Sequence, residues 1–172
     1  MTKKLLIFCL ALFAANIHAT AQADEIFTIY LVRHSEKDMS SSQHSDLPLS
    51  PCGEQRSEAL SNFLSDVQLE AVYSTEYTRT VNTALPTSTS KGLEIQPYTS
   101  EDLEAFALSL FDKKQNSLVV GHSNTTGYLA GLLIDEEGED ISLDIYDRIY
   151  QVVVSGNTAR LHLLHSSFEC DE

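Results

Sequence analysis

Short apolar runs alternate with stretches of helical periodicity along most of the chain, and this alternation constrains the fold more than any other feature. The run 26–32 is almost wholly apolar and rich in β-branched residues, as is typical of a strand buried on both faces. Further strand candidates lie at 69–74, 94–98 and 117–122, and each is followed by a helical pattern. This order predicts an α/β fold with a mostly parallel central sheet.

The helical stretches carry recognisable start and stop signals. Ser50 followed by Pro51 is typical of a helix N-cap and first turn, and the apolar residues that repeat at helical spacing after it predict one buried face: Leu60, Phe63, Leu64 and Val67. A second helix is expected from about Tyr77 to residue 84, where Pro86 should disturb it.

Two more features complete the pattern towards the carboxyl end. Ser100 is expected to cap a third helix, and a fourth is expected at about 124–133. The strands 149–155 and 158–165 should form a hairpin, because Gly156-Asn157 is a suitable two-residue turn.

The amino-terminal segment differs from the rest of the chain. Lys3 and Lys4 precede an apolar run at 5–15, and Ala-Gln-Ala at 21–23 matches a cleavage site. This is typical of a secretory signal peptide over 1–23, with an uncleaved anchor as the alternative. A single domain over 24–172 is expected to follow, and a bacterial periplasmic or secreted location is the predicted destination.

The net charge limits the classes of binding partner, and the cysteines raise the question of a disulfide. The chain has 25 acidic residues against 11 Lys plus Arg, for a net charge of −14, which argues against nucleic acid or an anionic membrane as the main partner after cleavage of the leader. In an oxidising compartment Cys52 and Cys170 could form a disulfide or remain two separate thiols.

Cationic side chains gather where the predicted strands end. Arg33 and His34 end the first strand, Arg79 follows the second, and His122 and Ser123 end the fourth. In parallel sheets ligands bind beyond the carboxyl ends of the strands. Guanidinium groups bind phosphate oxygens in a bidentate way, and the helix expected directly after Ser123 adds backbone N–H donors.

This set suits phosphoryl transfer, because a neutral imidazole can act as the nucleophile while cations stabilise the charge on phosphorus oxygens. Each residue alone has a structural alternative: a strand end, a surface charge or a core histidine. A zinc site is the chemical competitor, but the two arginines would repel a cation and no typical ligand spacing is present. The sequence therefore predicts no metal and no cofactor.

Four segments together resemble the histidine phosphatase superfamily, also called phosphoglycerate mutase-like. They are LVRHSEK at 31–37, LSPCGEQR at 49–56, YSTEYTRTVNTA at 73–84 and VVGHS at 119–123. The resemblance implies a three-layer α/β/α sandwich and a metal-independent reaction. It implies His34 as the nucleophile that forms a phosphohistidine, with Arg33, Arg79 and His122 holding the phosphoryl oxygens.

The general acid of that family has no recognisable counterpart in this sequence. Glu36, Glu101 and Asp102 are the candidates, although acidic residues in a first helical turn are more often there for the helix dipole. The short chain and the weak acid favour a hydrolase over a mutase, acting on a small phosphorylated compound or a phosphoramidate. The alternative is a catalytically weak module of the same fold that binds phosphate or a phosphosugar.

Overall fold

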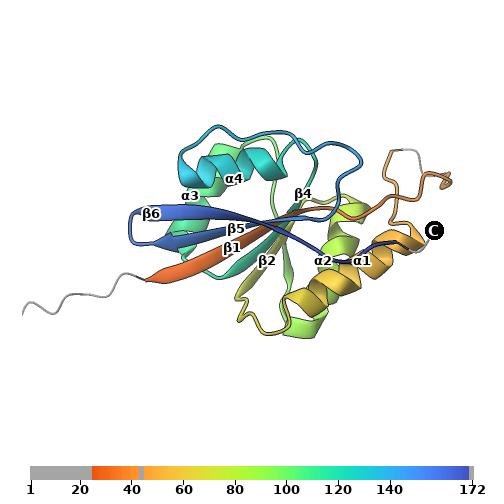
Figure 1. Cartoon of the computed structure of the whole chain (residues 1–172), viewed down its shortest axis with the longest axis horizontal. Helices are drawn as coiled ribbons and strands as arrows, with labels where there is room; N and C mark the ends of the chain where they lie inside the picture. Colours follow the sequence, from red (N-terminus) through yellow and green to blue (C-terminus); the bar gives the residue numbers. More distant parts are fainter. Residues whose placement is uncertain (1–24, 43–44, 171–172) are drawn as a thin grey trace, which may run out of the picture.

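The structure, a computed structural model, describes residues 25–42 and 45–170. The expected signal peptide at 1–23 lies outside these residues. Figure 1 shows the elements, which follow one another as β1 (Ile26–Arg33), α1 (Pro51–Phe63), β2 (Ala71–Ser74), α2 (Thr78–Lys91), β3 (Ile95–Pro97), α3 (Leu103–Lys113), β4 (Ser117–Gly121), α4 (Thr126–Ile134), β5 (Arg148–Ser155) and β6 (Thr158–His165).

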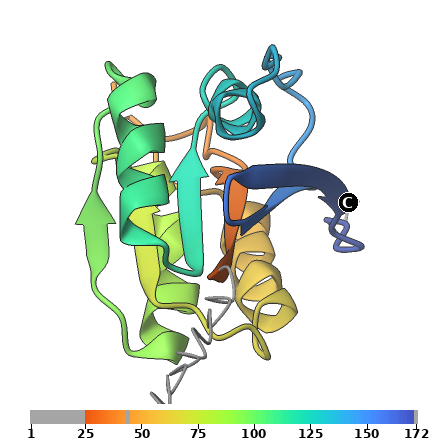
Figure 2. The ribbon, with the colours of Figure 1, turned by 90° about the vertical axis from the view of Figure 1, so that its left-hand side faces the viewer.

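The strands form one six-stranded sheet in the order β3-β2-β4-β1-β5-β6. β3, β2, β4 and β1 pair in parallel, whereas β5 and β6 add an antiparallel hairpin beside β1. Figure 2 shows β3 and β6 at the opposite edges. The predicted α/β fold and mostly parallel sheet are therefore confirmed, as is the hairpin.

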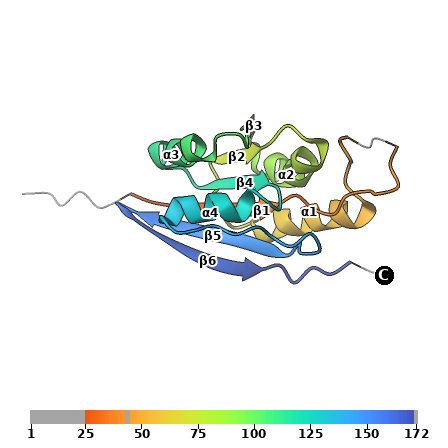
Figure 3. The same ribbon diagram turned by 90° about the horizontal axis from the view of Figure 1, so that it is seen from above.

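Helices cover both faces of this sheet and make three layers. One core contains Ala107 of α3 and Leu129 of α4 packed against the strands. The other contains Leu60 of α1 and Ala84 of α2. Figure 1 shows these two pairs of helices on opposite faces of the sheet, and Figure 3 shows β5 and β6 side by side along one edge. Both faces of β1 and β4 are buried, which explains their nearly continuous apolar sequence.

The first helix begins as predicted, since the Ser50 side chain accepts a hydrogen bond from the Gly53 N–H. The prediction that Phe63 shares its buried face is wrong, because Phe63 is 47% exposed while Leu60 and Leu64 are buried. At 100° per residue, Phe63 and Leu64 lie on opposite sides of Leu60, and the buried core contains Leu60 and Leu64 but not Phe63.

The second helix runs through Pro86 to Lys91, so the prediction that it stops near residue 84 is wrong. Proline removes one backbone hydrogen bond in a helix interior. Beyond it, Thr87 and Ser88 are buried against the rest of the protein, which offsets the lost bond. The helix ends instead at Gly92, whose left-handed φ of 65° is the usual C-cap conformation.

The third helix starts later than predicted. Its N-cap is Asp102, whose carboxylate accepts a hydrogen bond from the Ala105 N–H at 2.9 Å, and not Ser100. Among the described residues, no helix is long and apolar enough to span a membrane.

Candidate active site

The sheet topology brings the predicted site residues together at the carboxyl ends of the parallel strands. β1 and β4 are parallel neighbours, with Arg33 in register with Gly121. His34 directly follows β1, and its N–H donates to the Gly121 carbonyl at 2.9 Å. His122 directly follows β4, and the His34 and His122 rings lie with their centroids 5.6 Å apart. Residues 88 positions apart in the chain therefore meet because two parallel strands end together.

His34 is held as a neutral imidazole with a defined tautomer. Its Nδ1 lies 2.7 Å from the Ser35 carbonyl oxygen, and because a carbonyl only accepts, Nδ1 carries the hydrogen and Nε2 keeps its lone pair. Burial, followed by the charges of Arg33 and Arg79, lowers the pKa of His34 to about 3. At neutral pH His34 thus presents an unprotonated nitrogen, as a nucleophile requires.

His122 is fixed from both ring nitrogens. Its Nδ1 lies 3.5 Å from Nη2 of Arg79, and its Nε2 lies 3.0 Å from Oγ1 of Thr75. A guanidinium only donates, so this pair of contacts fits a neutral His122 with the hydrogen on Nε2, donated to Thr75. Burial and then the charge of Arg79 lower the pKa of His122 to about 4.

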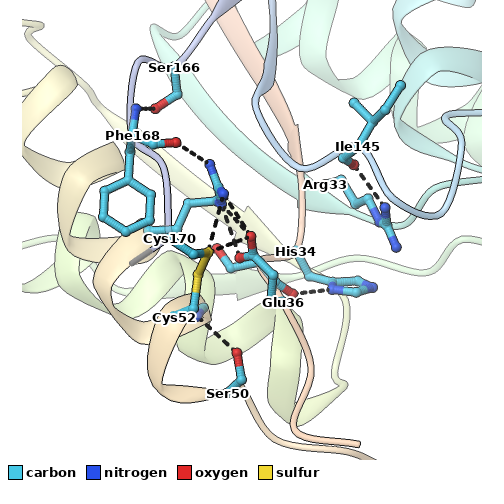
Figure 4. Close-up of polar contacts among 12 residues, drawn as sticks. Arg33, His34, Glu36, Ser50, Cys52, Ile145, Ser166, Phe168 and Cys170 are labelled. Atoms are coloured by element: carbon cyan, nitrogen blue, oxygen red, sulfur yellow. Dashed lines mark hydrogen bonds and ion pairs between the residues drawn. A yellow bond between two sulfur atoms is a disulfide. The ribbon is translucent and has the colours of Figure 1, made fainter. Parts of the chain in front are cut away.

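Arg33 is held by the segment that precedes β5. Its Nη1 donates to the carbonyls of Ser142, Leu143 and Ile145 at 3.2, 3.0 and 2.8 Å, and its guanidinium carbon lies 3.9 Å from the centre of the Tyr146 ring. Figure 4 shows Arg33 turned towards Ile145 next to His34. Sequence reasoning missed this support, because backbone carbonyls leave no signature in the side chains.

Arg79 lies in the first turn of α2. Its guanidinium carbon is 4.3 Å from the centre of the Tyr77 ring, and its Nη1 is 3.7 Å from the Asp46 carboxylate. The Nε atoms of Arg33 and Arg79 are both buried with no hydrogen-bond partner among the described residues. Buried donors normally have partners, so these two N–H groups are suited to an incoming oxyanion.

The three candidate acids lie in different surroundings. Glu36 forms a salt bridge with Arg56 at 2.7 Å, and Asp102 caps α3, so both carboxylates have structural partners. Glu101 is exposed and lines a groove of about 790 Å³ that also contains Thr75 and Tyr77, the neighbours of His122 and Arg79. Of the three, Glu101 is the one that faces a space beside the site.

Ser123 lies just beyond the carboxyl end of β4, whereas Cys52 lies in α1 and Cys170 lies after β6. Ser123 directly follows His122, and its carbonyl accepts the Ile141 N–H at 2.7 Å; α4 starts three residues later, at Thr126. Cys52 and Cys170 form a disulfide with their Cα atoms 5.6 Å apart, which realises one of the two alternatives left open by the sequence.

The disulfide belongs to a cluster next to the segment that follows His34. Arg56 pairs with Glu36 and donates to the Phe168 carbonyl at 3.1 Å, and Figure 4 shows this cluster near His34. One ligand atom each of Glu36, Cys52 and Cys170 lie within 4.8 Å of one another. The donor set does not fit a metal, because the sulfurs are bonded to each other and the carboxylate is paired with a cation.

Comparisons with known proteins agree with this fold. The family model described as histidine phosphatase superfamily (branch 1) matches residues 29–119. No curated protein matches the chain.

Three solved structures share the fold at low identity. The protein histidine phosphatase SixA complexed with tungstate has 18% identity and a TM-score of 0.66, covering 81% of this chain and 97% of that one. The alpha-ribazole phosphatase from Shigella flexneri has 18% identity and a TM-score of 0.67, and the match covers 85% of this chain and 100% of that one. A mycobacterial glucosyl-3-phosphoglycerate phosphatase has 13% identity and a TM-score of 0.64, and the match covers 83% of this chain and 100% of that one.

Proposed function

The chain belongs to the histidine phosphatase superfamily, and we propose that it is a metal-independent phosphohydrolase that acts through a phosphohistidine on His34. The substrate is a small phosphorylated compound or a phosphoramidate. One observation carries this proposal: His34 is neutral, its Nδ1 is engaged by a carbonyl, and cationic Arg33 and Arg79 flank it with Nε groups that have no partner among residues 25–42 and 45–170.

The first step transfers the phosphoryl group to the protein. The Nε2 lone pair of His34 forms a bond to phosphorus while the bond from phosphorus to the leaving oxygen or nitrogen breaks. Arg33 and Arg79 stabilise the charge on the remaining oxygens through their guanidinium donors, and His122 lies beside Arg79 with its Nε2–H donated to Thr75. The leaving atom takes up a proton, from Glu101 where that carboxyl is protonated or otherwise from water.

The second step returns the histidine to its starting form. A water oxygen attacks phosphorus, the bond between phosphorus and Nε2 breaks, and inorganic phosphate leaves. The proton lost by water passes to the carboxylate of Glu101 or to solvent. Because two of the three candidate acids already have structural partners, substrates with good leaving groups should react fastest.

The proposed location is the bacterial periplasm or the exterior. The leader-like sequence at 1–23 supports it, and so does the disulfide between Cys52 and Cys170, since such bonds persist in oxidising compartments.

The experiment compares the protein with its His34→Asn variant on an aryl phosphate, with and without chelator. His162→Asn, which alters an exposed histidine of β6, is the matched control. We expect a loss of kcat on the order of a thousandfold in His34→Asn, and no effect of chelator or of His162→Asn. Tight phosphate binding without turnover in the unaltered protein would instead identify the binding module.

A further inference from the structure

Asp46 lies beside Arg79 in the structure. Neither its position in a long loop nor its neighbours in sequence identify it as a functional residue. The loop after His34 is closed at its base by an antiparallel bridge between Lys37 and Leu49. Within that loop, the Asp46 carboxylate contacts the start of α2, which lies more than thirty positions further along the chain.

The carboxylate supplies the cap that α2 lacks. Tyr77, the N-cap residue, makes no side-chain capping bond. Instead the N–H of Thr78 donates to both Asp46 oxygens at 2.9 and 3.2 Å, and the Thr78 hydroxyl donates to Oδ2 at 2.6 Å. A carboxylate at this place also faces the positive end of the helix dipole. Three contacts to one residue leave Asp46 little freedom to reorient.

The same carboxylate lies next to Arg79. Its Oδ1 is 3.7 Å from Nη1 of Arg79, while Nη2 of that guanidinium is 3.5 Å from His122 and the Tyr77 ring covers one of its faces. With Nη1 on the Asp46 side, the Nε and Nη2 edge is left for the site, and the buried Nε has no hydrogen-bond partner in the part of the chain that the structure describes. That edge is the two-donor fork that binds a phosphoryl group.

We propose that Asp46 is a positioning residue for the phosphoryl-transfer reaction: its charge orients Arg79 so that the Nε and Nη2 donors face the phosphorus oxygens. The inference rests on the proposed function for its kinetic consequence and on the contacts around α2 for its geometry. Asp46 does not touch the substrate; it acts through Arg79.

The test separates this role from simple helix capping by comparing two substitutions. Asp46→Asn keeps a side-chain oxygen that can accept the Thr78 N–H but removes the charge, whereas Asp46→Ala removes both. If Asp46 positions Arg79 by charge, kcat/KM on an aryl phosphate should fall about ten- to a hundredfold in both variants. Asp46→Asn should keep the thermal stability of the unaltered protein, and Asp46→Ala should lose some of it. Activity of Asp46→Asn equal to that of the unaltered protein would reduce Asp46 to a cap and overturn the proposal.

A double-mutant cycle with Arg79→Gln adds a second readout. Because the effect of Asp46 passes through the guanidinium, Asp46→Asn should change kcat/KM less than twofold when Arg79 is already replaced. Equal losses in both backgrounds would contradict the proposal. Glu70→Gln is the matched control: Glu70 also accepts a backbone N–H, from Asn116 at 2.9 Å, but before β2 and β4 begin, and it should leave kcat/KM unchanged.

Binding of inorganic phosphate, measured by calorimetry, distinguishes failure of this inference from failure of the proposed function. If the unaltered protein binds phosphate without turning over any ester, the proposed hydrolase activity is wrong, and the cycle between Asp46 and Arg79 is then read from the dissociation constants. Coupling in those constants supports the positioning role, and additive effects overturn it.

Discussion

His34 and His122 are buried among cationic groups, and this placement determines both their reactivity and their effect on stability. Burial is the first cause of each lowered pKa, and the neighbouring arginines add to it. The ring of His34 is therefore unprotonated at neutral pH, so the proposed attack on phosphorus needs no prior loss of a proton. The same burial destabilises the folded protein in acid, because the unfolded chain can take up protons that the folded protein excludes.

This difference predicts a pH dependence of stability. The folded-state pKa values are about 3 for His34 and about 4 for His122, against 6.5 for an unperturbed histidine. Between pH 6.5 and 4 the unfolded state binds more protons, so the free energy of unfolding should fall as the pH falls, by up to about 1.4 kcal/mol per pH unit for each histidine. Denaturant unfolding of His34→Asn at pH 7, 6 and 5 should show a shallower fall than that of His162→Asn. Parallel curves would contradict the lowered pKa of His34.

Glu101 provides a second prediction at this scale. If its carboxyl protonates the leaving group across the groove that it lines with Thr75 and Tyr77, Glu101→Gln should slow hydrolysis of an alkyl phosphate about tenfold or more, while a nitrophenyl phosphate, which leaves without help, should react at nearly the original rate. Glu104→Gln in the first turn of α3 is the control. A uniform effect on both substrates would exclude the acid role.

At the scale of elements, the start of α1 is tied to the segment that follows His34. The Ser50 N–H donates to the Glu36 carbonyl at 2.9 Å, and a Cβ atom on Gly53 would lie 2.3 Å from that same carbonyl oxygen. Glycine is needed here because two backbone segments approach each other closely. The helix thereby supports the loop that carries His34 into the site.

Gly53→Ala should consequently destabilise the protein and disturb the site. The backbone of Glu36 would have to move, so we expect a loss of about 1–3 kcal/mol in the free energy of unfolding together with a lower kcat/KM. Glu58→Ala, an exposed position on the same helix, should change both by little. Unchanged stability of Gly53→Ala in denaturant titrations would show that the two segments separate easily.

Sequence patterns predict these elements well where local chemistry decides and poorly where packing decides. Ser50 caps α1 through its own side chain and Gly156 turns the hairpin through its own backbone, and both predictions are confirmed. The predictions for Pro86 and Phe63 rest on local rules alone, and both are wrong. The continuation of α2 depends on contacts made by the turn beyond Pro86, and the exposure of Phe63 depends on which side of α1 the sheet covers. Neither contact can be inferred from the residues nearby in the sequence.

At the scale of the whole molecule, the parallel order of β2, β4 and β1 assembles the site from distant segments, and the ends of strands predict its main residues. The partners that orient those residues escape prediction. Asp46 and Tyr146 come from irregular segments whose course depends on the complete fold. The disulfide joins residues 118 positions apart and holds the segment after β6 against α1, as Figure 4 also shows.

Removing that disulfide should lower global stability. A cross-link over so long a loop restricts the unfolded chain strongly, so a variant with both Cys52→Ser and Cys170→Ser should lose about 2–5 kcal/mol in the free energy of unfolding. A reductant should shift the denaturation midpoint of the unaltered protein towards that of the variant and leave the variant unchanged. An identical midpoint with and without reductant would contradict a stabilising bond.

The most direct test of the account is to trap the covalent intermediate. The protein is mixed with a ³²P-labelled phosphodonor, quenched in alkali within milliseconds and mapped by mass spectrometry. We predict acid-labile phosphate on His34, absent from His34→Asn and retained in His162→Asn. Turnover that leaves no label on His34, or label on a different residue, would contradict the role assigned to this histidine.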